Sequence, residues 1–352
     1  MCISGFIIWI NSPSSSSSSG GHKDRLLDWT HIKLPVSSSS SKVHGICPGL
    51  RASSKPALVV ARVQDDGDVQ WLQKLSHKYH LCIYDSDAPP DAVSKHLRVP
   101  ANRGHEAMAY LTFIIDNYHD IPAAGAVFVH GSRFSWHNDH PEYDNADLLA
   151  SLNVTAAIEP SGYHNMRCDW SAGTCPSDVK PQGSLENKLQ SRVSPWELRT
   201  VADAAIPAAF AELFGGGKGD NVHLPHDMVL RSQCCAQFVV SQASIWQHSR
   251  NEYVALRQWL LSGSAPRDDR ISGRILSYIW HILFIQHTSV ATEGDFISLS
   301  SLNRLGCPDA QQCYCQLYGR CNLECSRPGH CKGQYSIPPR YALPDGWAEQ
   351  HS

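Results

Sequence analysis

The chain has 352 residues, of which 42% are hydrophobic, and it carries a formal net charge of −3. This length and apolar content suffice for one large or two modest cores, and the slightly negative charge argues against a generally basic nucleic-acid-binding protein. The apolar run Ile7–Ile10 is too short to span a bilayer and lacks the flanks of a signal peptide, so we expect a cytoplasmic protein without a membrane partner.

Serine dominates the first part of the chain. The runs Ser14–Ser19 and Ser37–Ser41 cannot bury enough apolar surface to offset the entropy lost on ordering, which predicts disorder. The expected divisions are a disordered leader at 1–54, an α/β catalytic domain at 55–305, a cysteine-rich segment packed on it at 306–335, and a proline-containing tail at 336–352.

The first predicted β-α-β unit has acidic residues after both of its strands. Ala57–Arg62 and Leu81–Tyr84 are runs typical of buried strands, and Trp71–Tyr79 between them has apolar residues at helical spacing. The carboxylates that follow the two strands are Asp65, Asp66 and Asp68, and then Asp85 and Asp87. They could bind a divalent metal or a cationic amine, or they could form a solvated turn.

An apolar face predicts a helix over residues 104–118 that packs on the sheet. Asn102 and Arg103 lie at its start, where free backbone N–H groups favour an anion or a carboxylate. Because this turn directly precedes the central strand in sequence, we expect it, together with Glu106, to border the same crevice.

The stretch Ala126–Asn145 is the strongest candidate for an active site. Its first residues form a short buried strand that stops at His130, and ligand crevices in α/β folds lie at the carboxyl ends of strands. The loop that follows is dense in ionisable groups, among them Arg133, His137, Asp139 and Glu142. We therefore expect part of an active site here.

The second half of the chain predicts one more strand at 236–240 and a core helix at 274–286. Together the elements indicate an α/β fold. Its mixed central sheet is built of β-α-β units with flanking helices, loosely like glycosyltransferase-A folds, and a cysteine-rich C-terminal segment follows.

Six of the thirteen cysteines fall between Cys307 and Cys331. Their spacing leaves three possibilities open, namely structural zinc, disulfides and plain buried thiols. For zinc, the candidate ligands are Cys307, Cys313, Cys315 and Cys321. In either bonded case, at least two of the six cysteines should lie within bonding reach of one another.

Six phrases in order suggest a family. They are Asn102–Ala107, Val127–Gly131, Trp136–Asp139, Cys234–Phe238, Gly273–His281, and Cys313–Cys315 with Tyr318-Gly319. Over roughly residues 56–335 the chain resembles a fungal family of arginine-containing cyclodipeptide synthases, formerly known only as a domain of unknown function.

The resemblance implies that arginine from arginyl-tRNA is joined to a second aminoacyl-tRNA to give a cyclo-Arg-Xaa diketopiperazine, with no cofactor required. It also implies an Asp-Asp-x-x-Glu motif. The nearest match runs from Asn138 to Glu142, so that Asp139 and Glu142 correspond and Asn138 replaces an aspartate.

Such chemistry suits these residue types. Glu142 or His137 could deprotonate an attacking amine, and Asp139 could hold a guanidinium in a bidentate pair. We expect Asp139 and Glu142 to face one cavity near His130, Arg133 and His137. The other candidate substrate-binding residues are Asn102, Arg103, Glu106, Asp65, Asp66 and Asp85.

Two other interpretations remain open. Asp85-Ser86-Asp87 is a passable D-x-D motif, which would suit a glycosyltransferase that holds a nucleotide sugar through a divalent metal. Alternatively, the carboxylates are only solvated loop charges on a non-catalytic, zinc-stapled scaffold.

Overall fold

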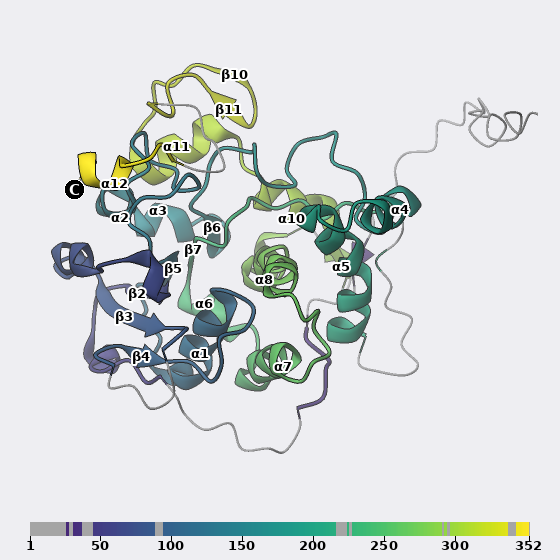
Figure 1. Cartoon of the computed structure of the whole chain (residues 1–352), viewed down its shortest axis with the longest axis horizontal. Helices are drawn as coiled ribbons and strands as arrows, with labels where there is room; N and C mark the ends of the chain where they lie inside the picture. The colour runs from purple at the N-terminus through teal and green to yellow at the C-terminus, as the bar shows by residue number, and fades with distance from the viewer. Residues whose placement is uncertain are drawn as a thin grey trace, which may run out of the picture.

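A six-stranded sheet organises the structure, a computed structural model (Figure 1). The described residues are 26–27, 31–36, 45–88, 94–215, 224, 227–290, 292–293, 296–336 and 343–351. Both serine runs of the expected leader lie outside them. No helix of the described part is long and apolar enough to cross a membrane.

The strand order in the central sheet is β4-β3-β2-β5-β7-β6. The strands are β2 (Ala57–Arg62), β3 (His80–Asp85), β4 (Leu97–Arg98), β5 (Ala126–His130), β6 (Tyr163–Asn165) and β7 (Phe238–Val240). The first four in this order are parallel, and β7 runs antiparallel to both of its neighbours. The sheet is therefore mixed, and the carboxyl ends of β2, β3 and β5 share one edge.

Helices cover both faces of this sheet. They are α1 (Ala107–Asp116), α2 (Asn145–Ser151), α3 (Val154–Ile158), α4 (Leu185–Val193), α5 (Leu198–Phe214), α6 (Gln242–Trp246), α7 (Arg250–Leu261), α8 (Asp269–Ser277), α9 (Trp280–Phe284), α10 (Leu299–Gly306), α11 (Ala310–Tyr318) and α12 (Trp347–His351). Short 3-10 turns lie at Leu50–Ala52 (η1), Gln64–Asp66 (η2), Gln70–Leu75 (η3), Tyr118–Asp120 (η4) and His287–Ser289 (η5). The larger core lies on the side of α1, α5 and α7–α9, and the smaller one on the side of η3, α2, α3 and α11 (Figure 1).

The apolar runs form strands because their alternate residues serve the two cores. Val59 and Phe128 belong to the larger core, whereas Leu58 and Val127 belong to the smaller one. Leu58 lies opposite Val127 in the parallel register. Strands covered on both faces are apolar throughout rather than alternating.

The predicted fold class is confirmed: a mixed sheet of β-α-β units, flanking helices and a cysteine-rich C-terminal segment are all present. Two local expectations differ. The expected helix over 71–79 is the 3-10 turn η3. The expected helix over 274–286 is two helices, because the backbone N–H of Ile279 bonds Leu276 O, three residues back, at 3.0 Å and tightens the turn between α8 and α9.

Two small antiparallel sheets complete the fold. β9 (Phe296–Ser298) lies between β1 (Leu26–Leu27) and β8 (Thr292–Glu293). β10 (Cys325–Arg327) pairs with β11 (His330–Cys331). The first of these sheets shows that part of the expected disordered leader packs on the body.

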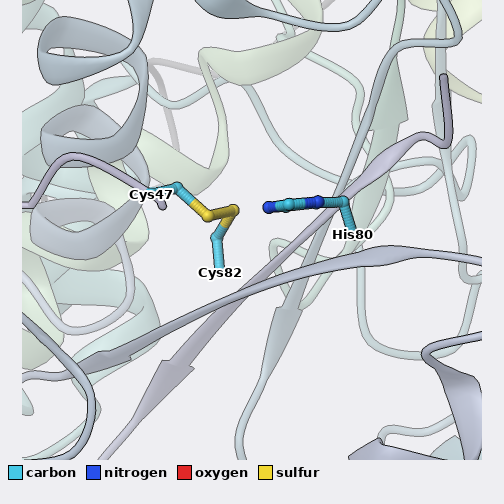
Figure 2. Close-up of side chains that lie close together, drawn as sticks. All are labelled: Cys47, His80 and Cys82. Atoms are coloured by element: carbon cyan, nitrogen blue, oxygen red, sulfur yellow. A yellow bond between two sulfur atoms is a disulfide. The ribbon is translucent and has the colours of Figure 1, made fainter. Parts of the chain in front are cut away.

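Other described parts of the leader are also ordered. Ile32 and Leu50 are buried in the larger core. Cys47 forms a disulfide with Cys82 of β3, close to the ring of His80 (Figure 2). Composition predicted disorder because it averages over 1–54, and these short apolar segments find partners far along the chain.

Six disulfides pair all twelve cysteines in the described part of the chain. They are Cys47–Cys82, Cys168–Cys313, Cys175–Cys307, Cys234–Cys235, Cys315–Cys321 and Cys325–Cys331. The expectation that at least two C-terminal cysteines lie within bonding reach is confirmed. The zinc site expected at Cys307, Cys313, Cys315 and Cys321 is wrong, because each of these sulfurs is bonded to another sulfur and offers no thiolate.

Candidate functional site

Two adjoining pockets open at the carboxyl edge of the parallel strands. The first has a volume of about 530 Å³ and is lined by Ala61, Arg62, Val63, Asp66, Ser86, Asn102, His105, Glu106, His130, Ser132, His137 and Asp269. The second has a volume of about 510 Å³ and is lined chiefly by His105, Glu106, His130, Trp136, His137, Glu197, Arg199, Cys234, Cys235, Arg270, Arg274 and Tyr278. Four residues line both pockets, namely His105, Glu106, His130 and His137. We call these four residues the shared wall.

His137 presents an unpartnered nitrogen at the shared wall. Its Nδ1 lies 2.8 Å from Ser135 Oγ, and its Nε2 is buried and has no hydrogen-bond partner among the described residues. Burial, followed by the neighbouring His130 and Arg167, holds the pKa of His137 well below its usual range. The ring is therefore neutral at physiological pH, and it can exchange a proton through Nε2.

Arg167 and Gln237 fix the backbone around the two imidazoles. Buried Arg167 donates from Nη1 to His137 O at 3.1 Å, and its guanidinium lies 5.7 Å from the centre of the Trp136 ring. Gln237 of the segment leading into β7 accepts from His130 N at 3.3 Å. The two histidines are thus held from behind by buried polar groups.

Glu106 reaches the shared wall through an unusual turn. Gly104 and His105 both have positive φ, of 67° and 53°. A Cβ on Gly104 would lie 2.8 Å from Leu260 Cδ2, so only glycine fits this close approach. The turn ends at the N-cap of α1, where the Glu106 carboxylate has no hydrogen-bond partner among the described residues.

The floor of the first pocket joins the ends of β2 and β5. Ser132 Oγ donates to Asp66 Oδ1, and Val63 N donates to the other carboxylate oxygen of Asp66 at 2.9 Å. A Cβ on Gly131 would lie 2.6 Å from Asp66 Oδ2, so a larger residue would separate the two loops. The arrangement fixes a carboxylate and a hydroxyl side by side.

The second pocket is richer in cations. Arg199 donates to Gly173 O at 2.7 Å, and Arg270 and Arg274 of α8 line the same space. Its remaining wall includes the disulfide between the neighbours Cys234 and Cys235. His130 Nε2 donates to Cys235 O at 2.7 Å, which ties this wall to the shared wall.

Residues 58–316 match the family model described as "Protein of unknown function (DUF3431)", which covers well over half of the chain. This chain belongs to the DUF3431 family. No curated protein matches, and no solved structure does. The expected membership of the arginine-containing cyclodipeptide synthases is therefore wrong, because the matching family is uncharacterised and nothing links it to those enzymes.

In this DUF3431 protein, Asp139 does not face a pocket. Its side chain is buried; Oδ1 accepts from Tyr314 Oη at 2.8 Å and from Tyr335 Oη, and Oδ2 accepts from Cys168 N. The expected position facing a cavity is wrong, because both oxygens of the carboxylate bond groups within the protein, namely two tyrosine hydroxyls and backbone N–H groups at Cys168 and Asp169.

Glu142 and Asn138 also lie away from the pockets. The Glu142 carboxylate is half-exposed, accepts from Ser336 Oγ, and lies 3.7 Å from His351 Nε2. Asn138 is fully buried, donates to Arg133 O at 2.9 Å, and accepts from Gln237 Nε2 at 3.1 Å. The expected common cavity for Asp139 and Glu142 is therefore wrong.

Two predicted substrate-binding residues are engaged in structural pairs. Arg133 forms an ion pair with Asp144, its Nη2 lying 2.9 Å from Oδ2. Arg103 pairs with Asp269 at 2.5 Å and donates to Arg267 O at 2.7 Å, which anchors the loop before α8. Their guanidinium groups are occupied within the protein.

Asp85 closes the end of β3. It accepts from Arg62 Nη1 at 2.8 Å and from Ser94 Oγ at 2.5 Å, and His96 Nδ1 lies 3.1 Å away. Burial raises the pKa of this carboxyl, but the bonds from these three groups outweigh it and lower the pKa below its ordinary value. Asp87 accepts from Gln64 N at 2.9 Å through Oδ2, so one oxygen of the second D-x-D carboxylate also holds the backbone.

The remaining predicted residues divide between two places. Asp66, Glu106, His130, His137 and Asn102 line the crevice, as expected from the sequence. Asp65 instead lines a third pocket with Gln70 and Trp71, which shares Asp66 and Ser132 with the first.

Sequence reasoning missed His105 and the arginines of the second pocket. The Gly104-His105 pair before the helix was the available signal for His105, because glycine there permits the positive φ. Arg199, Arg270 and Arg274 lie on helices that come from distant parts of the chain, and nothing local marks them as pocket residues.

Two groups of potential metal ligands occur among the described residues, and neither is in the crevice. One is Cys47, His80 and Cys82, whose sulfurs are joined as a disulfide (Figure 2). The other is His31, His248 and Glu252. The crevice itself is lined by imidazoles, carboxylates and a hydroxyl, which are the side chains typical of a proton-transfer site.

Proposed function

We propose that this protein is an enzyme in which His137 acts as the general base of a transfer reaction between two substrates. The observation that carries the proposal is the position of His137 Nε2, which is buried, unpartnered and placed in the wall that both pockets share. A neutral imidazole with one uncommitted nitrogen can accept a proton from a group bound on either side.

The two pockets differ in charge, which supports two different ligands. The first offers the carboxylate of Glu106, which suits a cationic amine or guanidinium. The second offers Arg199 and Arg274, which suit an anionic or strongly polar group, whereas Arg270 is paired with Asp268. If one substrate binds in each pocket, the two substrates lie next to each other beside His137.

The reaction class that fits best is transfer of an acyl group from an activated ester to an amine. The amine nitrogen forms the new C–N bond, His137 takes its proton, the ester C–O bond breaks, and the leaving alkoxide receives a proton. Such a reaction needs two positioned substrates and a base rather than ATP. The aminoacyl-tRNA form expected from the sequence stays a prediction.

The paired cysteines bear on where this chemistry takes place. Disulfides persist in oxidising compartments and are rare in the cytosol. Six of them favour an oxidising compartment over the cytoplasmic location expected from the sequence, and they favour a small activated ester over a tRNA as the acyl donor.

The metal-dependent glycosyltransferase alternative has less support. It needs carboxylates free to hold a cation under a diphosphate. Asp85 is bound by Arg62 and His96, and Asp87 is bound by a backbone N–H. The carboxylates at the end of β3 therefore serve the fold.

The test is expression in a host with an oxidising folding compartment, with mass spectrometry of the products. Wild type is compared with His137→Gln and with His140→Gln, which lies in the same loop outside both pockets. We expect a new basic amide, with arginine-containing diketopiperazines among the masses searched. Its amount should fall on the order of 100-fold in His137→Gln, the usual scale for a lost base, and stay unchanged in His140→Gln.

Equal product from wild type and His137→Gln would overturn the assignment of the base. A product that contains a sugar instead of an amide would replace acyl transfer with glycosyl transfer. Melting temperatures of both variants within a few degrees of wild type ensure that the comparison reports chemistry rather than folding.

A further inference from the structure

Three histidines and one glutamate form a cluster that includes no residue of the two crevice pockets. His31 belongs to the ordered part of the N-terminal segment, His248 and Glu252 flank the start of α7, and His287 lies in η5. The His31 and His248 ring centres are 5.0 Å apart, and the His287 ring lies 5.8 Å and 6.1 Å from them.

One oxygen is the focus of this cluster. Glu252 Oε1 lies 3.0 Å from Nδ1 of His31 and 3.0 Å from Nδ1 of His248, and it accepts from Ile32 N at 3.1 Å. The other oxygen of Glu252 accepts from Ser249 N at 2.7 Å as part of a capping box. The carboxylate is therefore fixed at the first turn of α7 with Oε1 directed at the two rings.

The hydrogen bonds of His248 determine which of its nitrogens is protonated. Its Nε2 lies 2.9 Å from Leu283 O, and because a carbonyl only accepts, Nε2 carries the proton. In a neutral ring, Nδ1 then has a lone pair pointing at the carboxylate oxygen. Two acceptors at 3.0 Å repel each other unless a cation lies between them.

We propose that His31, His248 and Glu252 bind a Zn²⁺ ion beside the ring of His287. Two imidazoles and a carboxylate are a usual ligand set for zinc, and a zinc-bound histidine normally donates its other N–H to a carbonyl, as His248 does to Leu283. His287 brings a buried Nε2 that has no hydrogen-bond partner among the described residues.

The spacing suits the ion. Zinc–ligand bonds of about 2.0–2.1 Å in a tetrahedron put neighbouring ligand atoms about 3.3 Å apart. The two Nδ1–Oε1 distances are 3.0 Å, and all three ligand atoms lie within 4.8 Å of one another. His31 is exposed, which gives the ion a path from solvent.

A zinc ion at this site would link the N-terminal segment that contains His31 to the start of α7. Ile32 is already buried and Lys33 N donates to Leu213 O at 2.9 Å, so residues 31–33 lie against α5 and α7. A shared ion between His31 and Glu252 would add a bond that the segment cannot break without releasing the metal.

The test is zinc binding to the full, oxidised chain after dialysis against a chelator. Metal content is measured at buffered free zinc, and Co²⁺ substitution reports the coordination by its visible absorption. The decisive variant is His31→Gln, since this exposed side chain can change without disturbing the core. The matched control is His77→Gln, an exposed histidine outside the cluster whose Nδ1 bonds Lys74 O.

We expect one zinc per chain in wild type and in His77→Gln. His31→Gln should bind at least about 10-fold more weakly, since even the loss of a supporting group costs that much at a metal site. Zinc should also slow cleavage by trypsin after Lys33 in wild type but not in His31→Gln.

Zinc binding that is equal in His31→Gln and wild type would overturn the proposal, as would a wild-type chain that binds none at micromolar free zinc. In the second case an imidazolium–carboxylate cluster is the correct description. Neither result depends on the chemistry proposed for the crevice, because the readout is metal content and cleavage rather than activity.

Discussion

The rings of His130 and His137 meet edge to face, with their centres 4.7 Å apart. His130 donates its Nε2 proton to Cys235 O, while His137 contacts Ser135 Oγ through Nδ1. After burial, the neighbouring His130 is the next cause that lowers the pKa of His137. Two neighbouring imidazoles with different partners suit a site that receives a proton and then releases it.

Glu106 should be essential for the proposed reaction. It lines both pockets and has no hydrogen-bond partner among the described residues, so its charge is available to a cationic substrate. We expect Glu106→Gln to reduce product formation on the order of 100-fold with little change in melting temperature. The measurement is product yield beside Glu159→Gln, an exposed control that should behave as wild type.

Asp139 should matter for stability rather than for chemistry. The amide group of an asparagine would place an N–H donor against a donor that Asp139 now accepts from, either a tyrosine hydroxyl or the backbone N–H of Cys168. In addition, the buried Arg167 would lose a neighbouring negative charge. We expect Asp139→Asn to lower the free energy of unfolding by roughly 2–4 kcal/mol.

Urea denaturation checks this, with Glu142→Gln as the control. That side chain is half-exposed, and its amide should cost no more than about 0.5 kcal/mol. Equal unfolding midpoints for the two variants would contradict the structural role of Asp139.

His281 should make stability depend on pH. Burial lowers its pKa from 6.5 to about 4. Between these values the unfolded chain binds a proton that the folded chain does not, so stability falls as pH decreases through this window, on the order of 3 kcal/mol in total. Replacement by leucine should flatten the dependence of unfolding free energy on pH between 6.5 and 4. The same slope in His281→Leu as in wild type would show that other groups are responsible.

The cysteines should be almost completely oxidised. Thirteen are present and six disulfides use twelve, which leaves one, Cys2, outside the described residues. Alkylation in denaturant followed by intact mass measurement should therefore find one reactive thiol before reduction and thirteen after. Several reactive thiols in the native preparation would favour a reducing compartment.

Four of the six strands of the central sheet were predictable because they are mostly apolar runs, whereas β4 and β6 are short, contain polar residues and were not predicted. Ala57–Arg62 and Ala126–Val129 need to be apolar on both faces, and few other local structures tolerate that composition. The position of the crevice was also predictable, because parallel strands place their carboxyl ends at the same edge of the sheet. His130 and His137 were identified on that basis.

The roles of the acidic residues were not predictable. Asp139 and Glu106 carry the same group, and only their surroundings distinguish a structural carboxylate from an available one. Those surroundings come from far away: Tyr314 bonds Asp139 across 175 positions of sequence. The density of charge in the loop after β5 was a sound signal that the loop is special, but it could not show which side chains turn inward.

The partners of Asp139 also determine when the loop after β5 can reach its final form. Tyr314 and Tyr335 come from the last part of the chain, and Cys313 is bonded to Cys168 beside them. During synthesis the strands before the loop emerge first, so the loop that carries His137 remains without this support until Tyr335, 196 positions after Asp139, has been added. The support of this loop is thus made long after the loop itself, and a polypeptide that stopped before Cys313 would carry the central sheet without it.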